Sequence, residues 1–303
     1  MIGILLDLDT DRRGTLFYLD MAWNEVRSYA YDGTYRGSIG SQGEGPGEFK
    51  GVTSLTVADQ GRTLFVNDGG IVTRFERDGG STTFVSEFRA PPLGFGSCAM
   101  HGYYYTMGHD PTRHGIVHKI TYGGDVVLSF GEPYKHTTAW IAERFAMEGL
   151  LACNERHRII AQITKYIPAM TGYSESGELL WQVTFPEFRQ YTVAERVRSD
   201  GRTVRSVLTE NGRAEFKALF SDEDSFYVAY NIVDYDLDNK IMPDIIHKES
   251  HLFRIDARTG IGVYLGPAGP EIGEHIVAVD GEYRFTESGG FNKFSQIHIY
   301  RSR

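Results

Sequence analysis

The 303-residue sequence lacks the features that mark several large classes of protein. It has two cysteines, Cys98 and Cys153, which is too few for a disulfide-rich scaffold and makes no metal site by itself. No apolar run approaches the roughly 18 to 20 residues of a membrane-spanning helix, and the N-terminal apolar stretch meets a charge at Asp7, too early for a signal peptide. The formal net charge of -9 argues against a nucleic-acid-binding surface, which needs clustered Lys and Arg. We therefore predict no membrane-spanning segment and no nucleic-acid partner.

Both cysteines lie in apolar surroundings, in residues 97–100 (Ser-Cys-Ala-Met) and 151–153 (Leu-Ala-Cys). A buried thiol in such a setting behaves as a small hydrophobic side chain. We therefore expect two thiols in the core. A single disulfide between them is the alternative, because the spacing alone does not exclude it.

The motifs of two common enzyme classes are also missing. The sequence has no Gly-x-Ser-x-Gly turn, which presents the nucleophile of many hydrolases. The glycine-rich residues 43–47 (Gly-Glu-Gly-Pro-Gly) lack the Lys and the following helix that a phosphate-binding loop requires. Four glycines and a proline within residues 40–49 instead predict a turn or crossover of the chain.

The residues that are abundant favour an all-β fold. Aromatic residues make up 13% of the chain, and 35 glycines suit short strands joined by tight turns. Two-residue turns recur at intervals of 46, 45, 53 and 83 residues, at Asp32-Gly33, Asp78-Gly79, Gly123-Gly124, Ser176-Gly177 and Thr259-Gly260. A period of about 45 to 50 residues with four strands is typical of propeller blades. We predict a six-bladed β-propeller of four-stranded antiparallel blades, in one domain over residues 1–303.

The predicted blades cover residues 1–40, 50–90, 94–131, 148–186, 213–266 and 272–303. We attribute the 83-residue interval to insertions at 187–212 and 234–249 rather than to a seventh blade. The first insertion is too charged for a blade, and we expect a short amphipathic helix or an extended arm; residues 138–147 are expected to add a helical turn or two. Blade six shows three strands, so either it is short or residues upstream of Met1 complete it, and we favour the second reading.

One stretch also carries a likeness to a known family. Residues 38–49 (SIGSQGEGPGEF), followed by 64–68 (LFVND) and 72–75 (VTRF), resemble the NHL-type repeat of bacterial six-bladed, TolB-like propellers found among exported lipoproteins. Residues 130–134 and 265–270 match the same crossover motif in part. The resemblance implies the fold, an extracytoplasmic location (periplasmic or cell-surface) and a ligand-binding role. It implies no established activity, because one fold hosts many functions.

Strand parity divides the loops of such a propeller between two faces. When the innermost strand comes first in each blade, the loop between its second and third strands lies on the same face as the crossover to the next blade; we call this the crossover face. The two-residue turns lie on the opposite face and read as ordinary hairpin turns. Because the crossover-face loops are longer and chemically richer, we expect a protein or carbohydrate partner to bind there.

The candidate ligand-binding residues on this face are Glu44, Glu48, Asp68, His109, His114, Tyr134 and His136. Aromatic residues there could add contacts or belong to the core: Trp23, Tyr134, Trp140 and Phe291. Glu44 and Glu48 have a structural alternative, in which they brace the crossover by accepting backbone N–H bonds.

Three sets of residues are candidates for a metal ion. Asp234, Asp236 and Asp238 alternate as in a calcium loop, although the glycine and the bidentate glutamate of that loop are missing. Residues 7–11 (Asp-Leu-Asp-Thr-Asp) echo this pattern. A histidine cluster around His109, His114 and His118 fits no standard zinc spacing. We predict no cofactor and a monomer, with calcium or another divalent metal as the alternative.

The competing hypothesis is a metal-dependent hydrolase of the lactonase or phosphoesterase type, with metal-activated water in the central channel. Such a site needs carboxylate, amide and imidazole groups that project from the innermost strands. The expected first strands offer these residues near their ends: Ser54, Thr56, Ser97, Cys98, Asn154 and His275. Three or more carboxylate and imidazole groups converging on the channel axis would support this hypothesis, and their absence would count against it.

Overall fold

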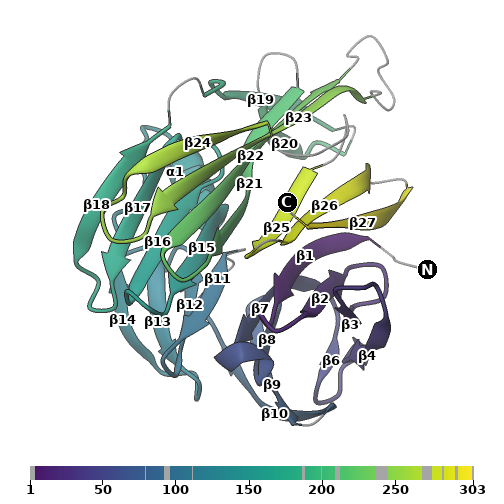
Figure 1. Cartoon of the computed structure of the whole chain (residues 1–303). Helices are drawn as coiled ribbons and strands as arrows, with labels where there is room; N and C mark the ends of the chain where they lie inside the picture. Colours follow the sequence, from purple (N-terminus) through teal and green to yellow (C-terminus); the bar gives the residue numbers. More distant parts are fainter. Residues whose placement is uncertain are drawn as a thin grey trace.

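A computed structural model of the chain confirms the six-bladed β-propeller (Figure 1). The structure describes residues 4–78, 80–91, 96–110, 112–185, 188–198, 200–208, 212–235, 245–267, 275–281, 283–290 and 293–301. In this part of the chain, five sheets have four strands and the last blade has three, as expected from the sequence. No helix among these residues is long and apolar enough to cross a membrane.

All strands within a blade are antiparallel and follow one another from the channel outward. Blades one to three contain β1 (Leu5–Thr10), β2 (Thr15–Asp20), β3 (Glu25–Ala30), β4 (Tyr35–Ile39); β7 (Val52–Ala58), β8 (Thr63–Asp68), β9 (Ile71–Asp78), β10 (Ser81–Arg89); and β11 (Ser97–Met100), β12 (Tyr103–Met107), β13 (Val117–Thr121), β14 (Val126–Phe130). Blades four to six contain β15 (Gly149–Asn154), β16 (Ile159–Thr164), β17 (Ala169–Ser174), β18 (Leu179–Thr184); β21 (Gly212–Ser221), β22 (Ser225–Tyr235), β23 (Ile245–Asp256), β24 (Gly262–Pro267); and β25 (His275–Asp280), β26 (Tyr283–Gly290), β27 (Lys293–Arg301).

The first strands of the six blades form the inner ring. In chain order, β1, β7, β11, β15, β21 and β25 each contact the next, and β25 contacts β1 to close the circle. The second strand of each blade packs against the neighbouring blades, and every residue of β2, for example, is buried. The core therefore consists of the layers between blades.

Aromatic side chains fill these layers. Phe65 of β8 packs against Phe88 within its own blade and against Tyr104 and Tyr122 of blade three, with ring centroids 4.8 to 6.4 Å apart. Burying one such side chain contributes about 2 kcal/mol. The high aromatic content of the sequence therefore serves the contacts between blades.

The glycine-rich stretch forms the crossover from blade one to blade two, as predicted. Its two ends pair in parallel as β5 (Ser41–Gln42) and β6 (Glu48–Phe49), and the Phe49 ring is fully buried against Phe75, 6.1 Å away. Gly40 has a φ of +73°, and a Cβ there would lie 2.2 Å from the Phe49 ring. Only glycine fits this position, because both the backbone angle and the close ring exclude a side chain.

The segment 187–212 contains a hairpin of β19 (Thr192–Val197) and β20 (Thr203–Leu208), so the extended-arm reading holds and the helix reading does not. This arm packs on α1 (Ala139–Met147), the helix predicted near 138–147, where the Tyr191 and Phe145 rings lie 5.0 Å apart. The described residues of the second predicted insertion, 234–235 and 245–249, belong to β22 and β23, which pair out to Tyr235 and Ile245. Residues 236–244 lie outside the described residues.

The expectation of two free thiols is wrong. Cys98 of β11 and Cys153 of β15 form a disulfide, with Cα atoms 5.6 Å apart. The two cysteines are 55 residues apart in the sequence, but the ring places β11 and β15 side by side. Such a pair of Cα atoms lies within bridging range, and spacing along the chain could not show this.

Candidate functional site

A cavity of about 810 Å³ occupies the centre of the ring. All six inner strands contribute to its wall, and its rim consists of the short turns that follow five of them, including Arg12, Gln60, His101, Arg156 and Glu223. These turns lie opposite the crossover face, and we call this side the hairpin face. The cavity is therefore on the side where the sequence suggested only hairpin turns.

Three cations line this cavity without an ion-pair partner among the described residues: Lys217, Arg12 and Arg13. Lys217 is exposed there because β21 carries a bulge, seen where the pairing with β22 skips from Phe216 to Ala218. A bulge leaves one residue unpaired and changes the direction of its side chain. Arg12 and Arg13 are exposed on the β1–β2 turn, where Arg12 has a φ of +55°.

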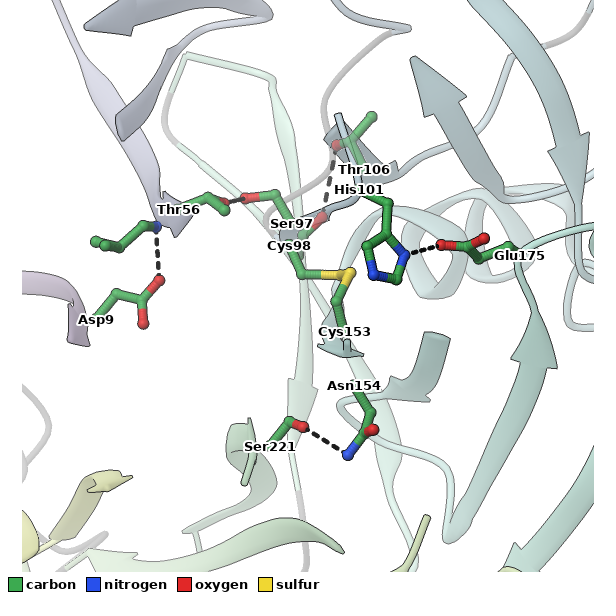
Figure 2. The surroundings of a disulfide bond; sticks show 12 residues. Asp9, Thr56, Ser97, Cys98, His101, Thr106, Cys153, Asn154, Glu175 and Ser221 are labelled. Atoms are coloured by element: carbon green, nitrogen blue, oxygen red, sulfur yellow. Dashed lines mark hydrogen bonds and ion pairs between the residues drawn. A yellow bond between two sulfur atoms is a disulfide. The ribbon is translucent and has the colours of Figure 1, made fainter. Parts of the chain in front are cut away.

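The two carboxylates of β1 are used to hold the wall together. Asp7 accepts the N–H groups of Leu8 and Leu55 at 2.9 and 2.8 Å. Asp9 likewise accepts those of Thr10 and Val57, at 2.8 and 2.7 Å (Figure 2). Burial outweighs these hydrogen bonds and raises the pKa of Asp7 to about 6 and that of Asp9 to about 7. Asp7 and Asp9 thus provide acceptors for the backbone N–H groups of Leu55 and Val57 at the inner edge of β7.

Most acidic side chains around the rim are also engaged. Asp11 accepts the N–H groups of Arg13 and Thr15, both at 2.8 Å, and Asp222 accepts those of Asp224 and Ser225. Glu223 pairs with Arg156 at 3.2 Å, and Asp59 accepts the Thr63 hydroxyl at 2.8 Å. Glu155 is the exception. Seven acids and four Lys or Arg residues line the cavity; most of the acids are bonded to N–H, hydroxyl or guanidinium groups, whereas Lys217, Arg12 and Arg13 are the cations that form no ion pair among the described residues.

Neighbouring inner strands are tied to each other at the wall. The Thr56 and Ser97 hydroxyls join blades two and three at 2.7 Å, the disulfide joins blades three and four, and Asn154 donates to the Ser221 hydroxyl at 3.2 Å to join blades four and five (Figure 2). Blade six is joined to blade one where Thr10 donates to Asp280 at 3.2 Å. These links hold the wall in one arrangement.

An ion-pair group lies beside the disulfide at the rim. His101, in the turn after β11, contacts Glu175 of blade four at 2.5 Å (Figure 2), and Arg158 binds the other oxygen of the same carboxylate at 2.5 Å. Burial raises the pKa of Glu175, but the hydrogen bonds from His101 and Arg158 outweigh it and the pKa is lowered. Glu175 is therefore ionised and braces two blades.

On the crossover face, the predicted acidic residues contact their own loop. Glu48 accepts the N–H of Gly45 at 2.8 Å, and Glu44 pairs with Lys50 at 2.7 Å, with both side chains mostly exposed. Asp68 accepts the N–H groups of Lys50 and Gly51 at 2.7 and 2.8 Å. The structure therefore shows Glu48 in its structural alternative, in which it braces the crossover by accepting a backbone N–H, and Asp68 acts in the same way.

The predicted histidines form no group of three or more metal ligands in the part of the chain that the structure describes, although Asp110 and His109 lie close enough to His118 to act on its pKa. His118 is fully buried in β13, where Nε2 donates to the Gly108 carbonyl and Nδ1 contacts the Ser129 hydroxyl, and burial lowers its pKa. His109 is half-buried and His114 is exposed. His136 accepts the N–H of Thr138 at 3.0 Å. None of the four lines the central cavity.

Tyr134 belongs to a small core beneath the β19–β20 arm. Its ring centroid lies 5.3 Å from that of Phe145 in α1, and its hydroxyl lies 3.4 Å from that of Tyr191. Tyr134 is half-buried in this position. Its role as a ligand contact stays a prediction.

The described residues hold no metal-ligand set. No group of three or more His, Cys, Asp or Glu side chains in this part of the chain is placed to hold a metal ion. Asp234 pairs with Arg189 at 2.5 Å, while Asp236 and Asp238 lie outside the described residues. Carboxylates and His101 do line the central cavity, but no three of them among the described residues are grouped to hold a metal ion, so the hydrolase hypothesis gains no support.

Sequence reasoning missed Lys217, Arg12 and Arg13 as site residues. A signal was available for Lys217, because it interrupts the apolar run of residues 216–220 (Phe-Lys-Ala-Leu-Phe) in an inner strand. The acids at 7, 9 and 11 were noticed as an alternating pattern, but the N–H groups of β7 that Asp7 and Asp9 bind lie 48 residues away.

Comparison with known proteins shows the fold. No protein-family model matches the sequence, and no curated protein matches it. Among solved structures, a member of the DUF4221 family from Bacteroides vulgatus superposes with a TM-score of 0.63 at 8% identity, covering 100% of this chain and 94% of that one. A Bacteroides fragilis protein assigned as exported gives 0.57 at 12% identity, covering 100% and 92%.

A eukaryotic structure is similar to a comparable degree. The β-propeller domain of Cps50 (Swd1) from Myceliophteria thermophila superposes with a TM-score of 0.53 at 14% identity, covering 100% of this chain and 98% of that one. At such low identity these likenesses establish a common architecture, which does not fix a function.

Proposed function

We propose that this propeller is a non-catalytic binding protein that takes an acidic segment of a partner protein into its central cavity from the hairpin face. The observation that carries this proposal is which charged side chains of the cavity wall are paired and which are not. Lys217, Arg12 and Arg13 have no ion-pair partner among the described residues, whereas Asp7 and Asp9 are already bonded to backbone N–H groups.

The size and rigidity of the cavity support binding of a short segment. A volume of about 810 Å³ lies within the range of known ligand sites, roughly 300 to 1,000 Å³. Because the inner strands are tied together by side-chain bonds and by the Cys98–Cys153 disulfide, the site is formed before the ligand arrives. Preorganisation of this kind lowers the entropy cost of binding.

The lining favours a peptide over a glycan. Sugar-binding sites commonly stack an aromatic ring against the sugar, and Phe220 and His101 are the aromatic residues in the described lining. Carboxylate groups of a peptide, by contrast, form charge-assisted hydrogen bonds with Lys and Arg. A uronate-bearing glycan is the alternative ligand with the same charge. Binding on the crossover face through Glu44, Glu48 and their neighbours stays a separate prediction.

An extracytoplasmic location fits this role. Disulfides persist mainly in oxidising compartments, and the Cys98–Cys153 bridge joins two strands of the inner ring. The solved structures that share this fold include one assigned as exported. The NHL-like, TolB-like crossover motif of residues 38–49 points the same way, toward the exported lipoprotein type.

Binding can be tested with the full chain and two labelled probes, an oligoglutamate peptide and an oligogalacturonate, by fluorescence anisotropy at low salt. We expect the peptide to bind, and Lys217→Met to weaken it about ten-fold or more, since hydrogen bonds to charged groups contribute about 1.5 to 3 kcal/mol. Lys135→Met removes an exposed lysine outside the cavity and serves as the control.

The results of this experiment distinguish a peptide ligand from a glycan ligand and from no ligand of either kind. Tighter binding of the oligogalacturonate, with the same dependence on Lys217, would replace the peptide by a glycan. Binding of neither probe, or equal effects of the two lysine variants, would overturn the proposal.

A further inference from the structure

Arginines gather on the hairpin face of blades one and two without forming an ion pair among the described residues. They lie in or beside the turns of that face and are Arg12, Arg13, Arg36, Arg62 and Arg77. Arg77 is half-buried and the others are exposed. The chain as a whole carries a net charge of -9, so this group, which we call the arginine patch, has the opposite sign to most of the protein.

The turns that carry the arginine patch contact one another. Gly61 of the β7–β8 turn packs so closely on the β1–β2 turn that a Cβ there would lie 2.5 Å from the Cβ of Asp11. Arg77, near the end of β9, donates to the Gly61 carbonyl at 3.2 Å and lies over the Phe17 ring of blade one, 4.7 Å from its centroid. Burial lowers the pKa of Arg77, and the positive charge of Arg36 lowers it further against the opposite effect of Asp11. Two guanidinium groups are thus held near each other, where an added anion would stabilise both.

Most acids near the arginine patch are bonded to groups other than its guanidinium groups. Asp11 and Asp32 accept backbone N–H groups. Asp59 accepts two hydroxyl groups, and Glu76 pairs with an arginine outside the patch. Asp78 is exposed and has no side-chain partner in the part of the chain that the structure describes. The arginines of the patch therefore outnumber the acids that are available to pair with them.

The exposed arginines are also held in place by the chain. Nε of Arg62 donates to the Asp59 carbonyl at 3.2 Å, and Nη1 of Arg36 donates to the Thr15 hydroxyl at 2.7 Å. A guanidinium group has five N–H donors, so each contact leaves donors that point to solvent. Such groups match the two oxygens of a carboxylate, and their fixed positions lower the entropy cost of binding one.

The arginine patch adjoins the central cavity. Arg12 and Arg13 line the cavity itself, while Arg62 and Arg77 line a separate hollow of about 590 Å³ between blades two and three. Asp59, in the β7–β8 turn, lines both. A peptide that leaves the cavity over this turn therefore reaches the patch directly.

The other side of the rim is different. In blades four and five, Arg156 pairs with Glu223 and Asp224 at 3.2 and 3.1 Å, and Arg158 pairs with Glu175 at 2.5 Å. These cations are already neutralised by acids of the chain. The distribution of unpaired charge thus favours blades one and two as the exit from the cavity.

We propose that the acidic segment bound in the cavity continues over the β7–β8 turn onto the arginine patch, so that the partner protein presents an acidic stretch longer than the cavity holds. This inference rests on the proposed function and adds the direction and length of the bound segment. The cavity and the patch then act on one ligand, which binds more tightly than either site would hold it alone.

Two labelled oligoglutamates test this inference by fluorescence anisotropy with the full chain. One has about four residues and the other about twelve, which extend to about 40 Å. Salt at about 0.15 M screens charges more than about 8 Å away. Arg36→Gln/Arg62→Gln should weaken the long peptide about five-fold or more and leave the short one unchanged, because each exposed ion pair contributes modestly. Lys217→Met should weaken both peptides.

Arg198→Gln/Arg202→Gln is the matched control. It removes the same charge from two exposed arginines at the end of the β19–β20 arm and should weaken neither peptide. If the short peptide binds through Lys217 but Arg36→Gln/Arg62→Gln leaves the long one unchanged, this inference fails and the proposed function stands. If the short peptide does not bind, both fail. Inorganic polyphosphate that binds through Arg62 without dependence on Lys217 would make the patch a separate anion site and would also overturn the inference.

Discussion

The two faces of the propeller use their polar side chains differently. On the crossover face, Glu48 and Asp68 accept N–H groups of the loop that leads into blade two. On the hairpin face, Lys217, Arg12 and Arg13 remain without ion-pair partners among the described residues. The crossover face has the longer loops, but the hairpin face has charged side chains that form no ion pair in the described part of the chain and can contact a ligand.

The loops of the two faces also differ in length. A long glycine-rich crossover leaves many backbone N–H groups without strand partners, and these must be satisfied by nearby acceptors. Carboxylates on that face are recruited for this purpose. A two-residue hairpin turn satisfies most of its own backbone groups, as where the N–H of Gly124 bonds to the Thr121 carbonyl. Carboxylates of the hairpin-face turns also accept backbone N–H groups, as Asp11 and Asp222 do, so on that face it is the cations that are left without ion pairs among the described residues.

The largest expected effect concerns the wall on which the hairpin-face site depends. Replacing the disulfide in Cys98→Ser/Cys153→Ser releases a loop of 55 residues, which should lower the free energy of unfolding by about 4 kcal/mol through greater entropy of the unfolded chain. Urea denaturation followed by tryptophan fluorescence measures this change.

Reduction of the wild type should reproduce the effect, whereas reductant should leave the double variant unchanged. A loss well below 1 kcal/mol would mean that the two blades are held together mainly by their other contacts.

A smaller effect is expected on the crossover face. Asp68→Ala leaves the N–H groups of Lys50 and Gly51 without their acceptor, and we expect a loss of about 2 kcal/mol in the free energy of unfolding. Oligoglutamate binding should not change, because Asp68 does not line the cavity. Asp125→Ala, at an exposed carboxylate, is the control for both measurements. Weakened binding in the Asp68 variant alone would mean that a residue of the crossover face contributes to ligand binding, which contradicts the difference between the two faces.

The smallest effect concerns the pH dependence of stability. Asp9 has a pKa of about 7 in the folded protein against an ordinary value of 3.8, so the folded state binds its proton more tightly than the unfolded state. This contribution to stability is complete below about pH 4 and is lost as the pH rises through 7.

Asp9→Asn should remove this loss, which is about 4 kcal/mol for a pKa raised from 3.8 to about 7, at about 1.4 kcal/mol per pH unit. Because Asn has one acceptor oxygen where Asp9 uses two, part of this is offset and we expect a net gain on the order of 1 kcal/mol over the wild type above pH 7. Thermal unfolding from pH 4 to 8 measures it. Asp9→Ala, which removes the acceptor for Val57 and Thr10, should be destabilised throughout. A wild type whose stability rises over this range relative to Asp9→Asn would contradict the raised pKa.

Local patterns in the sequence were enough for the fold. The recurring two-residue turns and the strands between them predict six blades, and the helix at 139–147 and the three strands of blade six follow from similar local signals. The charged segment 187–212 allowed two readings, and the contact with α1 shows why the arm is favoured: its Tyr191 side chain packs on Phe145. No single-segment pattern contains that partner.

The sequence by itself determined the number of blades and the crossover, because turn chemistry and strand alternation act over a few residues. The tertiary structure decided the rest. Closing the ring brings Cys98 to Cys153 and Asp9 to Val57 across 55 and 48 residues, and a bulge in β21 exposes Lys217 in the cavity. Such contacts depend on which strands become neighbours, and this depends on the whole ring rather than on any one segment.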